Sequence, residues 1–306
     1  MILVEHGNMW FIGGGYSSEA EHLAKCIVES MCIGSVNAFV LISGWFGIRS
    51  GLKKIGALAF MLFFCTVPLL IVALLCGWVS ISLITSVDGI YEYVFGGNAY
   101  WFVVDYIGLL IMSPVLNNGI KTVGKDKLRT LLLAAYALIL IYDFIFRAPI
   151  LGTEGGYSLI WFGFLYILAR YMRIYGSRLM DRYCLPILVA AVATQSILFY
   201  CGLIGMRYTN PLILTAAVCL ILVFKKWDFH SRAINYAATG CLMAYLLHMQ
   251  PVLVPYIRRF LIAEYTACGY WIYMLEILSL SAVVFLVAVI LDKVQSALYQ
   301  GIIKCL

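Results

Sequence analysis

Long apolar runs alternate along this chain with short segments that carry most of its charged residues. A helix needs about 20 apolar residues to cross the hydrocarbon of a membrane, and several runs approach or exceed that length. The predicted spans are 31–48, 55–86, 99–117, 129–146, 158–175, 184–205, 209–224, 235–258 and 270–291. Charged and apolar positions alternate through residues 16–30, which predicts an interfacial helix ahead of the first of these spans. We therefore expect an all-α fold, a polytopic transmembrane helix bundle with about nine spans.

The beginning of the chain carries too few apolar residues for a span of its own. Residues 2–4 are apolar but are followed at once by Glu5, His6 and a glycine-rich stretch. We read this piece as a truncated first helix, because it cannot cross about 30 Å of hydrocarbon. The expectation is that the native gene begins upstream of Met1 and encodes roughly 15–25 further residues.

The basic residues are distributed asymmetrically between the predicted spans. All but five of the 21 lie in connecting or terminal segments that fall on one side of the membrane. The exceptions are Lys25, Arg147, Arg207, Arg258 and Arg259. Because basic loops are retained in the cytoplasm, the asymmetry predicts that these segments are cytoplasmic. It also puts His6 at the outer end of the first helix and residues 43–46 near the inner end of the next.

Composition supports a membrane protein and excludes several other classes. The 306 residues are 64% hydrophobic and 12% charged, and the mean hydropathy is +0.97. One soluble domain cannot bury that much apolar surface, so we expect a single integral membrane domain over residues 1–306, surrounded by lipid. The ten cysteines stand singly, mostly within apolar runs, which is typical of packing residues rather than of disulfides or a metal site. No motif suggests a nucleic-acid partner, and no metal is expected.

The segment 35–49 combines apolar residues with polar groups at helical spacing. Asn37 and Gly44 are seven residues apart, which is two turns, so they share one face. Gly44 there permits the close approach of a neighbouring helix or of a thin ligand, to which Asn37 can form a hydrogen bond. The two interpretations, a helix-packing face and a ligand-binding face, both fit.

His6 is the first candidate for chemistry, because a side chain that titrates near neutrality beside a glycine-rich turn suits general-base work on a hydroxyl. The alternative is an interfacial histidine without a specific role. Near the other end of the chain, Tyr245 and His248 are three residues apart and share a helix face. A histidine inside a span is a functional candidate, although a buried structural histidine is equally consistent.

Polar residues also occur at the predicted outer ends of other spans. Asp105 lies about one turn inside its span, where a carboxylate is costly unless it faces water or the bundle interior. It is a site candidate, or else an interface anchor. Asp143 and Arg147 have the four-residue spacing of a helical ion pair, which we expect to account for both. Hydroxyl, ring and carboxylate groups that could hold a sugar, or form an aromatic belt, are those of Glu154, Tyr157, Ser158 and Trp161.

Four segments carry a resemblance to a known family. Residues 37–46 read Asn-x-Phe-Val-Leu-x-Ser-Gly-Trp-Phe, a span opened by Tyr100 and Trp101 closes with Ser-Pro-x-Leu-Asn, residues 156–162 read Gly-Tyr-Ser-x-x-Trp-Phe, and residues 245–248 read Tyr-Leu-x-His. In this order they resemble the membrane acyltransferase-3 family, bacterial multi-span enzymes that O-acylate cell-surface polysaccharides with cytosolic acyl-CoA. The chain departs from the family pattern in two places. In the family a catalytic histidine follows the apolar run of the first span, a place that His6 occupies here, but the chain lacks the basic residue expected about ten positions before it. It also lacks the arginine pair usual after the second span.

The resemblance implies an inner-membrane O-acyltransferase that moves an acetyl group from cytosolic acetyl-CoA to a hydroxyl of a cell-surface or lipid-linked polysaccharide. His6 would be catalytic, either as the base or as a brief carrier of the acyl group. Donor binding would involve Asn37, Ser43, Gly44, Arg49, Lys53 and Lys54, the three cations suiting a polyanion unless they are only a topology signal. Acceptor-binding or supporting residues would be Asp105, Glu154, Tyr157, Ser158, Trp161, Tyr245 and His248. The alternative function is a multi-span transporter of a glycan or lipid intermediate, although the chain lacks the two related halves expected of one.

Overall fold

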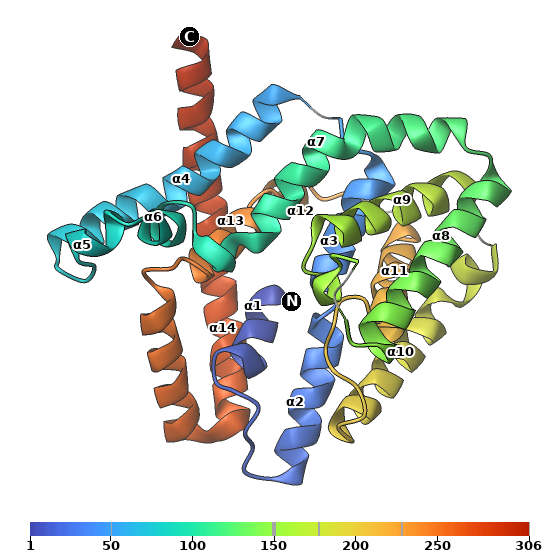
Figure 1. Cartoon of the computed structure of the whole chain (residues 1–306). Helices are drawn as coiled ribbons and strands as arrows, with labels where there is room; N and C mark the ends of the chain where they lie inside the picture. The colour runs from blue at the N-terminus through green and yellow to red at the C-terminus, as the bar shows by residue number, and fades with distance from the viewer. Residues whose placement is uncertain (50, 149–150, 177, 228, 306) are drawn as a thin grey trace. The chain divides into compact units, whose positions relative to one another are not determined.

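The computed structural model describes residues 1–49, 51–148, 151–176, 178–227 and 229–305 (Figure 1). Every element in these ranges is helical, which confirms the all-α prediction. The elements of the first half are α1 (Ile2–Glu5), η1 (His6–Trp10), α2 (Glu19–Cys32), α3 (Ser35–Phe46), α4 (Leu52–Leu75), α5 (Ile81–Ile84), α6 (Val87–Val94), η2 (Gly97–Tyr100) and α7 (Trp101–Thr122). Those of the second half are α8 (Lys125–Leu140), η3 (Ile141–Ile145), η4 (Glu154–Gly156), α9 (Leu159–Tyr175), α10 (Arg178–Tyr200), α11 (Pro211–Lys225), α12 (Arg232–Ala238), α13 (Cys241–His248) and α14 (Val254–Cys305).

Six helical segments of the described chain are long and apolar enough to cross a membrane. They are Glu19–Phe46, Lys53–Leu75, Gly97–Thr122, Lys125–Ile145, Arg178–Tyr200 and Val254–Cys305. Each overlaps a predicted span, and Val254–Cys305 overlaps 270–291 together with the last residues of 235–258. The other three predicted spans fall on α9, on α11 and on the pair α12 and α13, which are shorter helices. The structure therefore supports a multi-pass membrane protein with about six candidate spans.

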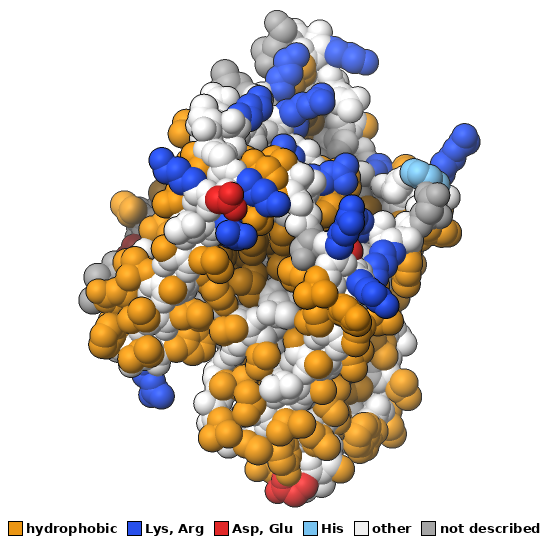
Figure 2. Space-filling view, turned by 90° about the vertical axis from the view of Figure 1, so that its right-hand side faces the viewer, with side chains coloured by type: hydrophobic (Ala, Val, Ile, Leu, Met, Phe, Trp, Pro, Cys, Tyr) orange, Lys and Arg blue, Asp and Glu red, His pale blue; other side chains and the backbone are white. Residues whose placement is uncertain are grey.

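Apolar side chains cover much of the surface, as expected for a protein surrounded by lipid. Figure 2 shows hydrophobic side chains spread over most of the visible face, with fewer charged groups among them. Among the most exposed are Leu75 and Val87, each 83% exposed, and Phe46 at 78%. A soluble domain rarely leaves so many large apolar side chains in water.

The chain forms two compact units that interleave in sequence. Unit 1 comprises Met1–Glu5, Gly15–Ser50 and Val104–Phe229, and unit 2 comprises His6–Gly14, Gly51–Val103 and His230–Leu306. Within unit 1, α3 packs on α9 and α10 packs on α11. A Cβ added at Gly44 would lie 2.7 Å from the Tyr166 carbonyl oxygen, so the glycine lets α3 and α9 approach closely.

Unit 2 contains the helices that differ most from the predicted spans. α4 ends at Leu75, before the expected 86, and Gly77 then takes a left-handed φ of 71°. The expected helix over 235–258 is divided at Gly240, where an added Cβ would lie 2.8 Å from the Val289 Cα. α14 turns back at Gly269, whose φ is 73°, so it forms two limbs of a hairpin (Figure 1).

Candidate functional site

Two histidines meet in unit 2. The Nε2 of His248 lies 2.9 Å from the Nδ1 of His6, and the ring centroids are 4.9 Å apart. His248, at the end of α13, is 6% exposed, and His6, in η1, is half-buried. The Nδ1 of His248 lies 2.8 Å from the Ala244 carbonyl oxygen, one turn earlier in the same helix. Both candidate histidines thus belong to one hydrogen-bonded chain.

The hydrogen-bond partners of the two histidines determine which ring nitrogens carry a proton when both rings are neutral. A carbonyl oxygen only accepts, so the Nδ1 of His248 carries the hydrogen that is donated to Ala244. The Nε2 of a neutral His248 is then an acceptor, and His6 donates its own Nδ1–H to it. The remaining nitrogen, Nε2 of His6, keeps its lone pair. A histidine held in this tautomer can accept a proton from a hydroxyl.

The turn that carries His6 is fixed by the second limb of α14. The Tyr273 hydroxyl donates to the Gly7 carbonyl at 2.7 Å, and the Tyr270 hydroxyl donates to the Asn8 Oδ1 at 2.9 Å. Gly7 also packs on Ile277, because an added Cβ would lie 3.0 Å from two of its side-chain atoms. These tyrosines were not predicted as site residues, since their contacts with η1 join positions more than 260 residues apart.

Tyr245 lies beside the histidine pair, as its spacing from His248 predicted. Its ring centroid is 5.9 Å from that of His248, and its hydroxyl donates to the Ala99 carbonyl at 2.6 Å. The Tyr100 hydroxyl donates to the Leu246 carbonyl, also at 2.6 Å. Two hydroxyl–carbonyl hydrogen bonds therefore hold α13 to η2, and they fix the position of the helix that ends in His248.

In unit 1 the structure brings Asn37 and Trp161 together. The Trp161 indole nitrogen donates to the Asn37 Oδ1 at 2.9 Å, and the Asn37 Nδ2 donates to the Tyr208 carbonyl at 2.8 Å. Asn37 and Trp161 are fully buried. Both ends of the Asn37 amide thus have protein partners. With Gly44 packed against α9, this arrangement fits the helix-packing interpretation of residues 35–49.

Polar contacts also hold the C-terminal end of α3, close to Ser43. The Ser43 hydroxyl is 3.0 Å from the Tyr106 hydroxyl. The Tyr166 hydroxyl accepts from the Ile48 backbone nitrogen at 2.9 Å and donates to the Asn117 Oδ1 at 2.8 Å. The last turn of α3 is therefore fixed in unit 1 by side chains from α7 and α9.

Three cations surround Trp45 near that end. Arg170 donates to the Trp45 carbonyl at 3.4 Å, while Arg173 and Lys225 lie 5.3 and 5.6 Å from the centre of its ring. From the sequence, these three cations were interpreted only as part of the basic segments that indicate the cytoplasmic side. Of the predicted donor-binding cations, Arg49 belongs to unit 1, and Lys53 and Lys54 belong to unit 2. The structure therefore identifies in unit 1 a cationic cluster, Arg170, Arg173 and Lys225, that the spacing of basic residues had not singled out.

The predicted acceptor residues of unit 1 include one with a clear structural role. Ser158 caps α9 and accepts from the Trp161 backbone nitrogen at 3.3 Å. Tyr157 is 43% exposed, and its ring centroid is 4.8 Å from that of Tyr208. Glu154 has a left-handed φ of 45°, and Asp105 is half-buried in α7.

Asp143 is not paired with Arg147, so the predicted helical ion pair is wrong. The helix changes to a π-turn over η3, and Arg147 beyond it is exposed with a left-handed φ of 50°. The four-residue rule applies to a regular α-helix, which this segment is not. Asp143 instead accepts from the Thr153 hydroxyl at 2.7 Å, and its carbonyl accepts from Arg207 at 2.7 Å.

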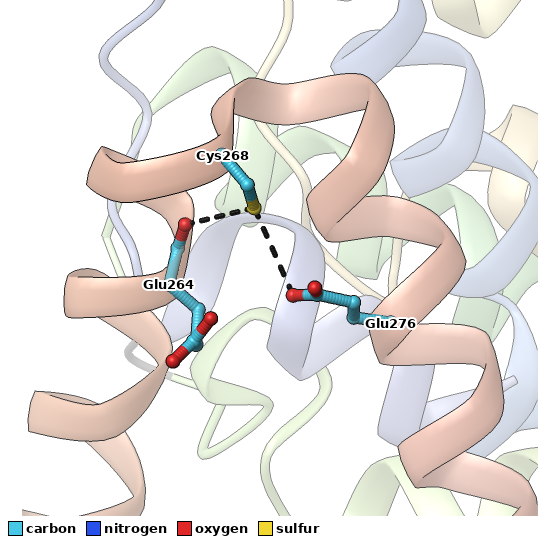
Figure 3. Close-up of side chains that lie close together, drawn as sticks. All are labelled: Glu264, Cys268 and Glu276. Carbon is cyan, nitrogen blue, oxygen red and sulfur yellow. Dashed lines mark hydrogen bonds between the residues drawn. The ribbon is translucent and has the colours of Figure 1, made fainter.

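One cluster of possible metal-ligating groups occurs in the described residues. Figure 3 shows Glu264 and Cys268 on the first limb of α14 and Glu276 on the second. The Cys268 thiol donates to the Glu264 carbonyl at 2.9 Å, and its sulfur is 3.7 Å from the Glu276 carboxylate. Because the three side chains are partly or fully exposed and their contacts are internal to the hairpin, they can be explained without an ion.

Fold and site together define an all-helical, multi-pass membrane protein with a hydrogen-bonded pair of histidines, one buried and one half-buried. Comparisons with protein-family models, with curated proteins and with solved structures found no match. The resemblance to the acyltransferase-3 family therefore stays a prediction from sequence motifs, and the function must be argued from the chain's own geometry.

Proposed function

We propose that this protein is an integral membrane O-acyltransferase that transfers an acetyl group from acetyl-CoA to a hydroxyl of a cell-surface or lipid-linked polysaccharide. The observation that carries the proposal is the hydrogen bond between His6 and His248. Two residues selected separately from the sequence, 242 positions apart, form one pair in which the proton positions leave a basic nitrogen free.

The Nε2 of His6 removes the proton from the acceptor hydroxyl. His6 then carries a positive charge, and its Nδ1–H still donates to His248, which stabilises that charge. The acceptor oxygen forms a bond to the thioester carbonyl carbon, the carbon–sulfur bond breaks, and the thiolate takes the proton from His6. In the second route the same lone pair forms a bond to the thioester carbonyl carbon, the carbon–sulfur bond breaks and the thiolate leaves. The acceptor oxygen then forms its bond to that carbon, the carbon–nitrogen bond to His6 breaks, and the hydroxyl proton passes to the thiolate.

The donor side is assigned to the cytoplasmic ends of the helices in this proposal. A polyanion such as coenzyme A needs cations, and Arg49, Lys53 and Lys54 were predicted for that role. The cations around Trp45 support a cytoplasmic polyanion site, because Arg170, Arg173 and Lys225 lie around the C-terminal end of α3, the helix that precedes Arg49. In this proposal Asn37, Ser43 and Gly44 fix the position of α3, the helix along which the donor approaches.

The full topology also belongs to the proposal. Nine spans, with basic loops in the cytoplasm and His6 at the outer side, let a cytosolic donor reach an external acceptor. Glu154, Tyr157 and Asp105 are assigned to acceptor binding in this arrangement. The bacterial inner membrane is the location that the acceptor chemistry requires.

Labelled acetyl transfer tests the proposal. Inverted membrane vesicles with and without the protein receive radiolabelled acetyl-CoA on their exposed cytoplasmic face, and glycan and lipid-linked glycan fractions are counted. We expect label in one of these fractions only when the protein is present, and release by mild alkali identifies an ester. Equal label with and without the protein would reject acyl transfer. Glycan movement across the membrane without any acetylation would instead favour the transporter.

A further inference from the structure

Asp143 is a buried carboxylate with one unsatisfied oxygen. It lies in the π-turn η3 at the end of α8 and is 3% exposed. Its Oδ1 accepts from the Thr153 hydroxyl at 2.7 Å, whereas its Oδ2 is buried and has no hydrogen-bond partner among the described residues. Buried polar atoms almost always have partners, and π-turns are frequent at functional sites.

A second unsatisfied atom lies on the segment that contacts this turn. Arg207 donates to the Asp143 carbonyl at 2.7 Å, which places residues 207–209 beside η3. Thr209 is fully buried, and its hydroxyl has no partner among the described residues. Its backbone is occupied, since its nitrogen donates to Gly155 at 3.4 Å and its carbonyl accepts from Tyr136 at 3.1 Å. Two elements of unit 1 thus each contribute one unsatisfied polar atom.

The residues around these atoms indicate which ligand they suit. A carboxylate oxygen accepts from a hydroxyl, and a threonine hydroxyl can donate or accept. The Tyr157 ring, which is 43% exposed and tilted by 50° from that of Tyr208, adds an apolar face of the kind that sugar rings contact. Glu154 is a further acceptor on the surface of the same loop. This combination suits a neutral polyhydroxyl group better than an anion.

An apolar recess lies on the same turn. Its volume is about 380 Å³, and it is lined by Ile141, Phe144 and Ile145 of η3 and by Ile204, Pro211 and Leu212. A free polysaccharide has no apolar part to occupy such a recess. Asp143 and Thr209 are not part of the lining of the recess, but each is next in sequence to a lining residue, Phe144 and Asn210. A sugar attached to a hydrocarbon chain has both parts, because its hydroxyls suit Asp143 and Thr209 and its chain suits the recess.

We infer that unit 1 binds a saccharide carried on a lipid chain, with Asp143 Oδ2 and Thr209 Oγ1 bound to sugar hydroxyls. The inference rests on the proposed function in its choice of acceptor, and it narrows that acceptor to the lipid-linked class. Binding needs no acyl donor and no histidine pair. It can therefore be measured separately from transfer.

Photolabelling with a nonyl β-glucoside that carries a diazirine in its alkyl chain tests the site. The protein is reconstituted in lipid nanodiscs, irradiated and analysed by mass spectrometry. We expect labelled peptides over residues 141–145 and 204–212, and competition by unlabelled nonyl β-glucoside. Asp143→Asn should reduce labelling about tenfold, the effect of losing a hydrogen bond to a charged group. Thr209→Val, a second variant in case the first unfolds, should reduce it severalfold.

Asp181→Asn is the matched control, because Asp181 is a carboxylate of the same unit that pairs with Lys225 at 3.0 Å. It should leave labelling unchanged. Size-exclusion profiles and thermal unfolding confirm that each variant is folded. Equal labelling of wild type and both site variants would overturn the inference, as would absence of label from the two segments in the wild type. Competition by nonanol equal to that by nonyl glucoside would mean that the recess binds hydrocarbon alone. A variant that loses labelling but still acetylates free polysaccharide would show that ligand binding at this site is independent of the proposed acetyl transfer.

Discussion

The Nδ1 of His6 donates to the Nε2 of His248 at 2.9 Å, although the two residues are 242 positions apart. Each histidine lies on a short helical element held by tyrosine hydroxyls: η1 by Tyr270 and Tyr273, and α13 by Tyr100. A reactive side chain must be held rigidly in order to act as a base. The pair therefore has the support that the proposed chemistry needs, and the first predictions concern it.

His6→Ala should lower acetyl transfer by about 10²–10⁴-fold, which is the usual contribution of a general base. Transfer is measured in vesicles beside the amount of folded protein, judged by size exclusion. His230→Ala serves as the control, because His230 is an exposed histidine of the same unit. Near-normal turnover in His6→Ala would remove His6 from the mechanism and turn attention to His248.

His248→Ala should lower kcat by about 10–100-fold with little change in KM, because the positioning partner of a histidine is lost while substrate contacts remain. His248→Gln should recover part of the rate, since its amide oxygen can accept from His6. A purely structural role for His248 would instead reduce the amount of folded protein and leave the kcat of the surviving protein normal.

Tyr273→Phe should destabilise the protein by about 1–3 kcal/mol, because the Gly7 carbonyl loses its donor in a buried position. Thermal unfolding in detergent measures the change. Tyr256→Phe is the comparison, because Tyr256 is 46% exposed. If both variants unfold at the same temperature as the wild type, the Tyr273 hydroxyl contributes nothing to holding η1.

Gly44→Ala should destabilise unit 1 by about 1–3 kcal/mol, the usual cost of overpacking. The added Cβ would lie 2.7 Å from the Tyr166 carbonyl oxygen and 2.8 Å from the Ala169 Cβ, so α3 and α9 must move apart. Gly163→Ala in α9 is the matched control, since its added Cβ would meet no described atom within 4 Å beyond its own chain neighbours and the backbone of its own helix. That variant should be neutral or more stable by up to about 1 kcal/mol. A reversed order of stability would contradict the close packing at Gly44.

The proposed orientation predicts opposite accessibility for two pairs of positions. In a variant without native cysteines, single cysteines at 92 and 154 should react with an impermeant thiol reagent in intact cells. Cysteines at 54 and 125 should react only after permeabilisation, because their loops carry the cytoplasmic basic residues. Labelling of position 54 from outside would reverse the topology.

Local sequence determines the class of this protein. Apolar runs of span length must form helices in lipid, because no water is available there to satisfy backbone groups outside hydrogen-bonded structure. The all-α fold and the membrane location follow from that constraint alone. His6 and His248 could be selected as candidates by residue type and position, and the hydrophobic pattern placed helices close to where α7, α9, α10 and α11 occur.

Only the tertiary structure decided which residues meet. The bond between His6 and His248, and the tyrosine hydroxyls that hold η1, join segments from opposite ends of the chain, and no local pattern encodes such pairings. Asp143 bonds to Thr153 rather than to Arg147 because a π-turn changes the helical spacing on which the sequence rule depends. The hydrophobic pattern separated spans ending at 258 and beginning at 270, but it did not predict that residues 254–268 form a helix that turns back at Gly269, since that reversal depends on one backbone angle and on the packing of the two limbs.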